Sequence, residues 1–134
     1  MSRRKLGLVA ALLVVAATAA TVALAAPAAK DPIIIGWAFD GKGNMAPFDG
    51  PALAAAQVRV KTVNGRGGVN GRKLVIETCD TNNNNPAKAK ACAARLLGQG
   101  ADIMFVTCDV EFSAPATQEA INRGVLAIAP CIGT

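Results

Sequence analysis

Four short apolar, largely β-branched runs alternate with longer segments of helical periodicity, and this alternation constrains the fold more than any other feature. The predicted strands cover residues 33–39, 73–78, 103–107 and 125–129. Continuous apolar runs suit strands that are buried on both faces, as in a parallel sheet. The segments between them are long enough to return over the sheet as helices. The sequence therefore predicts an α/β fold, β-α-β-α-β-α-β, with a parallel, doubly wound sheet.

Capping residues and periodic apolar positions predict the helix limits. The first helix should start near Asp49, with Phe48 packed on Leu53 as a staple. The second should have Asn85 as its cap with Pro86 in first position, and the third should be capped by Ser113. The predicted core faces are Leu53, Ala56, Val60 and Val63 in the first helix, and Ala89, Cys92, Ala93 and Leu96 in the second.

The amino terminus has the pattern of a secretory leader. A basic cluster at residues 3–5 precedes an uncharged run over residues 6–29, and Ala23 and Ala25 have the spacing that signal peptidase recognises. We expect a signal peptide over residues 1–25 and a periplasmic or extracellular protein. A retained membrane anchor is an alternative, because the run is nearly long enough to span. The paired arginines leave a twin-arginine export route open beside the general one.

The predicted leader carries most of the net positive charge of the chain. The sequence has 14 Lys and Arg against 9 Asp and Glu, and without the three basic leader residues the balance is 11 against 9. No Lys/Arg block or basic stripe with aromatic residues remains, so nucleic acid is not an expected partner. After a spacer over residues 26–32, residues 33–134 are expected to fold as part of one domain.

Cys79, Cys92, Cys108 and Cys131 all follow the predicted leader. An even number of cysteines in an exported protein favours disulfides over metal ligation. The chain has no histidine and no Cys-x-x-Cys motif, so no metal site is expected. Four cysteines allow three pairings, and the spacing alone does not choose among them.

One segment fits an enzyme motif. Residues 41–46 match the G-x-G-x-x-(G/A) pattern of dinucleotide-binding enzymes after a strand. Pro47 and the late helix start separate the glycines from the helix, and Asp80 lies too far along to be the ribose-binding acid. No Ser lies in a nucleophile elbow and there is no His, so hydrolase chemistry has no candidate. We expect no enzyme activity and no cofactor, and interpret the glycine loop as lining a ligand cleft.

Three stretches together resemble the type I periplasmic solute-binding proteins of ABC transporters, in particular the branched-chain amino acid-binding group. These are the helix and turn ending in NGRGGVNGRKL, the stretch ETCDTNNNNPAKAKACAARLL, and GADIMFVTCDVEFSAPATQEAINRGVLAIAPCIGT. The resemblance covers residues 31–134 and rests on the order and spacing of the motifs. It implies a two-lobed protein with Rossmann-like lobes that close on a small ligand, of which this chain is the incomplete first lobe.

A chain that stops five residues after its predicted fourth strand also favours a fragment, although a complete small α/β domain is an alternative. The resemblance implies capture of a small polar ligand, an amino acid or related compound, for delivery to the membrane permease of an ABC importer. An extracellular sensing domain of a membrane receptor is the alternative function. In either case the ligand would lie beyond the carboxyl ends of the strands.

The resemblance also implies a set of ligand contacts and a disulfide pairing. Asp109 stands where the family often has Ser or Thr, and with Glu111 it would oppose an anionic ligand group. Cys79 and Cys108 match a bridge found in some relatives, which leaves Cys92 and Cys131 for a second pair or Cys92 as a buried thiol. The implied ligand-binding residues are Phe48, Asp109, Ser113, Gly133 and Thr134.

Amino-terminal sequencing of the exported protein tests the leader. Cleavage after Ala25 gives a mature chain that begins with Ala26-Pro27. Replacing Ala23 and Ala25 with bulky Leu should block cleavage and leave the precursor in the membrane fraction, whereas Ala20→Leu should not. A mature chain that still begins at Met1 would contradict the prediction.

Overall fold

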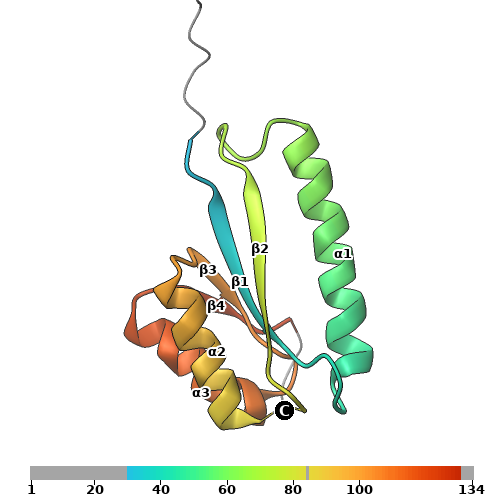
Figure 1. Ribbon diagram of the computed structural model, residues 1–134, viewed down its shortest axis with the longest axis vertical. Helices are drawn as coiled ribbons and strands as arrows, with labels where there is room; N and C mark the ends of the chain where they lie inside the picture. Colours follow the sequence, from blue (N-terminus) through green and yellow to red (C-terminus); the bar gives the residue numbers. More distant parts are fainter. Residues whose placement is uncertain (1–29, 84, 131–134) are drawn as a thin grey trace, which may run out of the picture.

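The fold is a four-stranded parallel sheet with helices on both faces (Figure 1). The computed structural model describes residues 30–83 and 85–130, so the predicted leader and the last four residues lie outside it. The strand order is β2-β1-β3-β4, and every pairing is parallel. The predicted fold class is therefore confirmed. In chain order the elements are β1 (Ile33–Phe39), α1 (Ala46–Gly65), β2 (Leu74–Asp80), α2 (Pro86–Gly98), β3 (Ile103–Phe105), α3 (Val110–Asn122) and β4 (Leu126–Ile128).

Helices α2 and α3 cover one face of the sheet, and α1 covers the other over β1 and β2 (Figure 1). The main core lies under α2 and α3. The predicted inner face of α2 is confirmed, because its four residues are at most 4% exposed. Gly36 of β1 allows α2 to approach, since a Cβ there would lie 3.1 Å from the Cβ of Leu96 and 2.7 Å from Met104 Sδ.

Helix α1 begins at Ala46, earlier than predicted. Its N-cap, Met45, makes no side-chain capping bond. Instead, the Met45 N–H donates to the carboxylate of Asp40 at 3.1 Å, which ties the residue before the helix to the end of β1. Phe48 is therefore inside the first turn and 60% exposed, and the predicted staple with buried Leu53 is wrong. The rest of the predicted α1 face is partly buried, as expected: Ala56, Val60 and Val63.

Helix α3 also begins earlier than predicted. Asp109 caps it by accepting the Glu111 N–H at 2.9 Å. Ser113, the predicted cap, lies one turn inside the helix, buried, with its hydroxyl donating to the Val110 carbonyl at 3.4 Å. The second helix begins as predicted, with Asn85 accepting the Lys88 N–H and Pro86 in first position.

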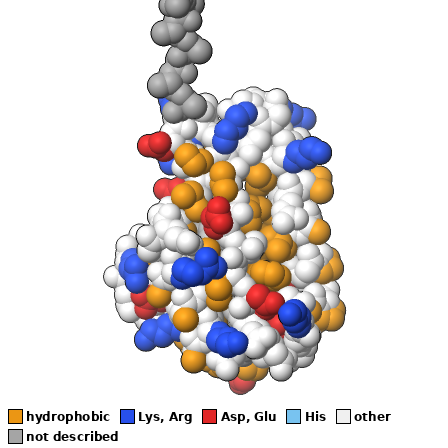
Figure 2. All heavy atoms as spheres, viewed as in Figure 1, with side chains coloured by type: hydrophobic (Ala, Val, Ile, Leu, Met, Phe, Trp, Pro, Cys, Tyr) orange, Lys and Arg blue, Asp and Glu red, His pale blue; other side chains and the backbone are white. Residues whose placement is uncertain are grey.

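The face of the sheet beside α1 carries exposed apolar surface. Figure 2 shows hydrophobic side chains gathered over the strands between α1 and the α2–α3 layer. Leu126 of β4 is 62% exposed. Trp37 of β1 is buried on this side and stacks on Phe105 of β3, with ring centroids 4.8 Å apart. None of the described helices is both long and apolar enough to span a membrane.

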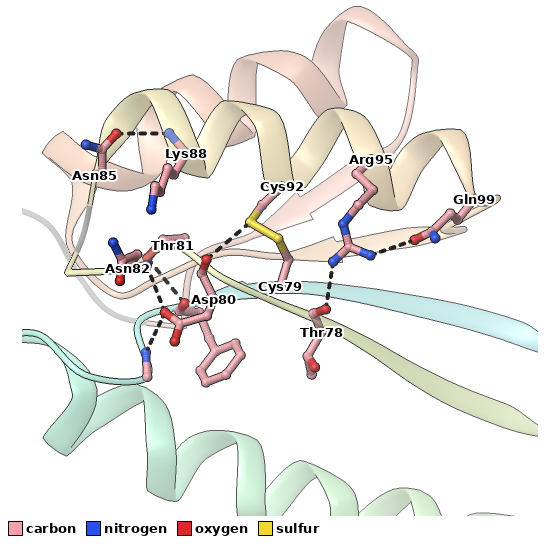
Figure 3. Close-up of a disulfide and its surroundings, with 12 residues drawn as sticks. Thr78, Cys79, Asp80, Thr81, Asn82, Asn85, Lys88, Cys92, Arg95 and Gln99 are labelled. Atoms are coloured by element: carbon pink, nitrogen blue, oxygen red, sulfur yellow. Dashed lines mark hydrogen bonds between the residues drawn. A yellow bond between two sulfur atoms is a disulfide. The ribbon is translucent and has the colours of Figure 1, made fainter.

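The disulfide pairing differs from the one that the family resemblance implied. Cys79, near the end of β2, is bonded to Cys92 of α2, with Cα atoms 5.5 Å apart (Figure 3). The expected Cys79–Cys108 bridge is wrong, and so is pairing of Cys92 with Cys131, which lies outside the described residues. Cys108 is itself disulfide-bonded.

The side of the sheet that Cys79 faces explains the correction, and the strand order adds to it. Because β1 lies between β2 and β3, a residue at the end of β2 is separated from the loop after β3 by two strand spacings, roughly 10 Å. A disulfide spans Cα atoms only about 4.4–6.8 Å apart. Cys79 faces the α2 side of the sheet, where Cys92 belongs to the buried core. Arg95 joins the same two elements by donating to the Thr78 carbonyl at 2.9 Å (Figure 3).

The Cys79–Cys92 bridge should stabilise the lobe by about 3 kcal/mol, the chain-entropy value for a loop of this length. The Cys79→Ser/Cys92→Ser double variant should lower the free energy of unfolding by about that amount in urea titrations. Peptide mapping without reductant should recover residues 79 and 92 in one linked species. Recovery of Cys79 linked to Cys108 would contradict the assignment.

Candidate ligand-binding site

Backbone N–H groups of two loops converge on one buried carboxylate at the carboxyl edge of the sheet. Asp40 directly follows β1 and is fully buried. Its Oδ1 accepts the N–H groups of Gly43 at 2.8 Å and of Lys42 at 3.2 Å, and its Oδ2 accepts that of Met45. Oδ1 also accepts the Asn83 N–H, at 3.2 Å, from the loop after β2. Asp40 therefore joins the β1–α1 loop to the β2–α2 loop.

The charge of Asp40 depends on these donors. Burial raises the pKa of its carboxyl, but the hydrogen bonds from Gly43, Lys42, Met45 and Asn83 outweigh burial and hold the pKa below the ordinary 3.8. Asp40 is therefore an anion at neutral pH, although no cationic side chain is bonded to it among the described residues. Glycine is needed at position 43, because a Cβ there would overlap Asp40 and Asn83.

Asp49 extends the network to a third loop. This residue of α1 is 2% exposed. Its Oδ2 accepts the Asp40 N–H at 2.7 Å, and its Oδ1 accepts the Cys108 N–H, from the loop after β3, at 3.4 Å. The predicted capping role of Asp49 is thus replaced by a tertiary one. It fixes the start of α1 against the ends of β1 and β3.

Two further hydrogen bonds join the end of β2 and the residue after it to the end of β1 and the loop after it. Asp80 Oδ1 accepts the Gly41 N–H at 3.2 Å, and the Thr81 hydroxyl donates to the Phe39 carbonyl at 3.2 Å. Asn82 and Asn83 adopt left-handed backbone conformations, with φ of 54° and 64°. Asparagine tolerates that region better than most residues. The asparagine run, interpreted from the sequence as a plain surface loop, thus turns the Asn83 N–H toward Asp40.

The predicted ligand residues fall at this edge where the structure describes them. Phe48 is exposed beside Asp49 at the start of α1, and Asp109 caps α3 beside Cys108. The Asp49–Cys108 hydrogen bond therefore joins the segments of these two residues. Ser113 is buried within α3 and its hydroxyl is bonded to its own helix. Gly133 and Thr134 lie outside the described residues.

Sequence reasoning missed one polar group at the site. Thr107, which the sequence suggested only as the end of a strand, lies between β3 and α3 and is 1% exposed. Its hydroxyl oxygen has no hydrogen-bond partner among the described residues. A buried hydroxyl without a partner is uncommon and needs an explanation. Its place at the carboxyl end of a central strand was the available signal, since ligands bind at that edge.

The glycine loop is not arranged for a phosphate. The N–H groups of Lys42 and Gly43, which would have to face a pyrophosphate, donate to the carboxylate of Asp40 instead. A negative charge already fills the position where a phosphate would lie. Within residues 30–83 and 85–130, no group of three acidic or cysteine side chains is placed to hold a metal ion.

The Asp40→Asn variant tests the carboxylate network. An amide keeps one acceptor but turns a donor toward an N–H group, so the variant should lose roughly 1–3 kcal/mol of stability at pH 7. Because the folded pKa is below 3.8, the contribution of Asp40 is complete above that pH and is lost as the pH falls through the folded value. Urea titrations should therefore show a difference between variant and wild type that shrinks toward pH 2. The exposed Asp31→Asn is the control, and a pH-independent difference would contradict the assignment.

Comparison with known proteins agrees with this architecture. The family model described as periplasmic binding protein matches residues 32–133. No curated protein sequence matches the chain. Among solved structures, similarity extends to the branched-chain amino acid transporter substrate-binding protein LivJ from Streptococcus pneumoniae, in complex with isoleucine. The TM-score is 0.70 with 24% identity, over 76% of this chain and 30% of LivJ.

Two other similar structures have different ligands in their descriptions. One is a fatty acid ABC transporter substrate-binding protein from Thermomonospora curvata, with a TM-score of 0.57 and 26% identity over 69% of this chain and 22% of that protein. The other is a solute-binding protein of an ABC transporter from Rhodopseudomonas palustris, in complex with 3,4-dihydroxybenzoic acid. Its TM-score is 0.65 with 19% identity, over 78% of this chain and 28% of that protein.

The chain thus spans less than a third of the length of each of these proteins. Its four strands and three helices correspond to part of one lobe of such proteins. The family model, in contrast, covers nearly all of the described residues. The chain belongs to the periplasmic binding protein family.

Proposed function

We propose that the protein is an extracytoplasmic receptor that captures a small polar ligand, an amino acid or a related compound, and delivers it to the membrane permease of an ABC importer. The observation that carries the proposal is the family match over residues 32–133. Its similar structures are substrate-binding proteins of such transporters. On this proposal the protein binds its ligand without transforming it.

The geometry of the carboxyl edge supports capture at that edge. Asp40 and Asp49 hold the loops after β1, β2 and β3 to one another. Loops that are fixed before binding lose less conformational entropy when the ligand arrives. The ligand in this proposal lies against these loops, near Phe48 and the cap of α3. The Thr107 hydroxyl, which has no hydrogen-bond partner among the described residues, would gain one from the ligand.

A ligand screen on the full-length protein tests the proposal. The probes are L-isoleucine, octanoate and 3,4-dihydroxybenzoate, which represent the three ligand classes of the similar structures. L-Isoleucine or its amide should raise the unfolding temperature in a saturable manner, since a ligand at 100 times its Kd stabilises by about 2.7 kcal/mol. A shift with octanoate alone or with 3,4-dihydroxybenzoate alone would keep the receptor role and overturn the amino acid ligand. No shift with any class, with amino acid amides also inactive, would overturn the proposal.

The Thr107→Val variant tests the contact within that screen. Valine keeps the shape and removes only the hydroxyl, so ligand affinity measured by calorimetry should fall roughly tenfold. The unliganded variant should be at least as stable as wild type, because the hydroxyl has no hydrogen-bond partner to lose within residues 30–83 and 85–130. Thr117→Val, in α3, is the matched control and should leave affinity unchanged. Unchanged affinity in Thr107→Val would remove Thr107 from the site.

A further inference from the structure

The amino end of α3 already holds a carboxylate. Asp109 Oδ1 accepts the Glu111 N–H at 2.9 Å, and the Asp109 side chain belongs to the cap of a 13-residue helix. The first N–H groups of a helix are a common binding place for an anionic ligand group. At this helix an anion would have to displace Asp109 to reach the Glu111 N–H.

In the neighbouring loops, too, backbone N–H groups donate to carboxylates of the protein. The N–H groups of Lys42, Gly43 and Met45 donate to Asp40, and that of Cys108 donates to Asp49. Both acceptors are buried, so they are not exchanged for a ligand without loss of the loop structure. Backbone donors from the loops after β1 and β3 are therefore bonded to the protein's own carboxylates. Exposed Glu111 adds a further negative charge in the first turn of α3.

We propose that Asp109 is a specificity determinant that keeps anionic groups out of the β3–α3 loop. A ligand of this protein then turns a neutral or cationic group, such as an amide, hydroxyl or ammonium, toward the loop. A ligand that carries a carboxylate binds with the carboxylate directed away from it. The statement about the ligand rests on the proposed function, whereas the exclusion of anions by Asp109 does not.

Inorganic sulfate tests the exclusion without knowledge of the ligand. Sulfate is titrated into the ¹⁵N-labelled full-length protein while the Glu111 amide resonance is followed. The wild-type resonance should not respond. Asp109→Gly opens the Glu111 N–H, and glycine is itself a tolerated N-cap residue, so the resonance should then shift in a saturable manner. A wild-type response equal to that of Asp109→Gly, or no response in the variant, would overturn the proposal.

Two variants distinguish two reasons for which sulfate could be excluded: the Glu111 N–H is already hydrogen-bonded to Asp109, or the negative charge of the first turn repels the anion. Asp109→Asn keeps a side-chain oxygen that can accept the Glu111 N–H but removes the charge, and it should remain unresponsive to sulfate. Glu111→Gln removes a charge from the same turn and leaves the Asp109 cap intact, so it should also remain unresponsive. A sulfate response in Glu111→Gln alone would show that general charge, rather than Asp109, excludes the anion.

A matched ligand pair tests the statement about the ligand. L-Isoleucine and L-isoleucinamide differ only in whether a carboxylate or a carboxamide is present. In calorimetry, wild type should bind the amide more tightly, and Asp109→Gly should shift the ratio of the two Kd values roughly tenfold toward the carboxylate, the effect of one charge-assisted hydrogen bond. An equal ratio of the two Kd values in wild type and Asp109→Gly would overturn the statement about the ligand. If neither compound binds, the amino acid proposal fails, and the sulfate titration still decides the role of Asp109.

Discussion

The site depends on two buried carboxylates that accept backbone N–H groups from loops far apart in the sequence. Strands of a parallel sheet end in loops whose N–H groups have no partner in the sheet, and such groups are costly to bury unpaired. Asp40 accepts four of them and Asp49 accepts two. Because each carboxylate bonds to more than one loop, the position of every loop depends on the others. The carboxyl edge is thus one connected unit.

The sheet and the inner helix faces were predictable because they follow from local patterns. Apolar runs gave the strands, and helical spacing placed Leu96 and its neighbours on the inner face of α2. The starts of α1 and α3 were not predictable from the same rules. Asp49 and Ser113 have the composition of caps, but a capping rule reads only nearby residues. It cannot tell that Asp49 serves the Asp40 and Cys108 amides, or that Asp109 reaches the Glu111 amide first.

The disulfide pairing implied by the family resemblance was wrong. The bridge implied by the relatives would cross the end of β1, whereas Cys79 is bonded to Cys92 of α2. The observed partner was already on the predicted inner face of α2, and Cys79 faces that side of the sheet. Gly133 and Thr134, which the resemblance implied, lie outside the described residues. The position of Thr107 at the edge of the sheet was visible in the sequence, but the missing hydrogen-bond partner of its hydroxyl was not. Whether a hydroxyl finds a partner depends on every element packed around it.

Trp37, which stacks on Phe105 on the α1 side of the sheet, gives this protein an intrinsic fluorescent reporter. Trp37 is the single tryptophan of the chain, and it is buried in the central strand three residues before Asp40. Its indole N–H has no partner among the described residues, so the ring is held by packing and by Phe105 alone. Emission from such an indole is sensitive to small changes in polarity and ring contact. Events at the carboxyl edge can thereby be followed by the light that the protein itself emits, without an attached dye.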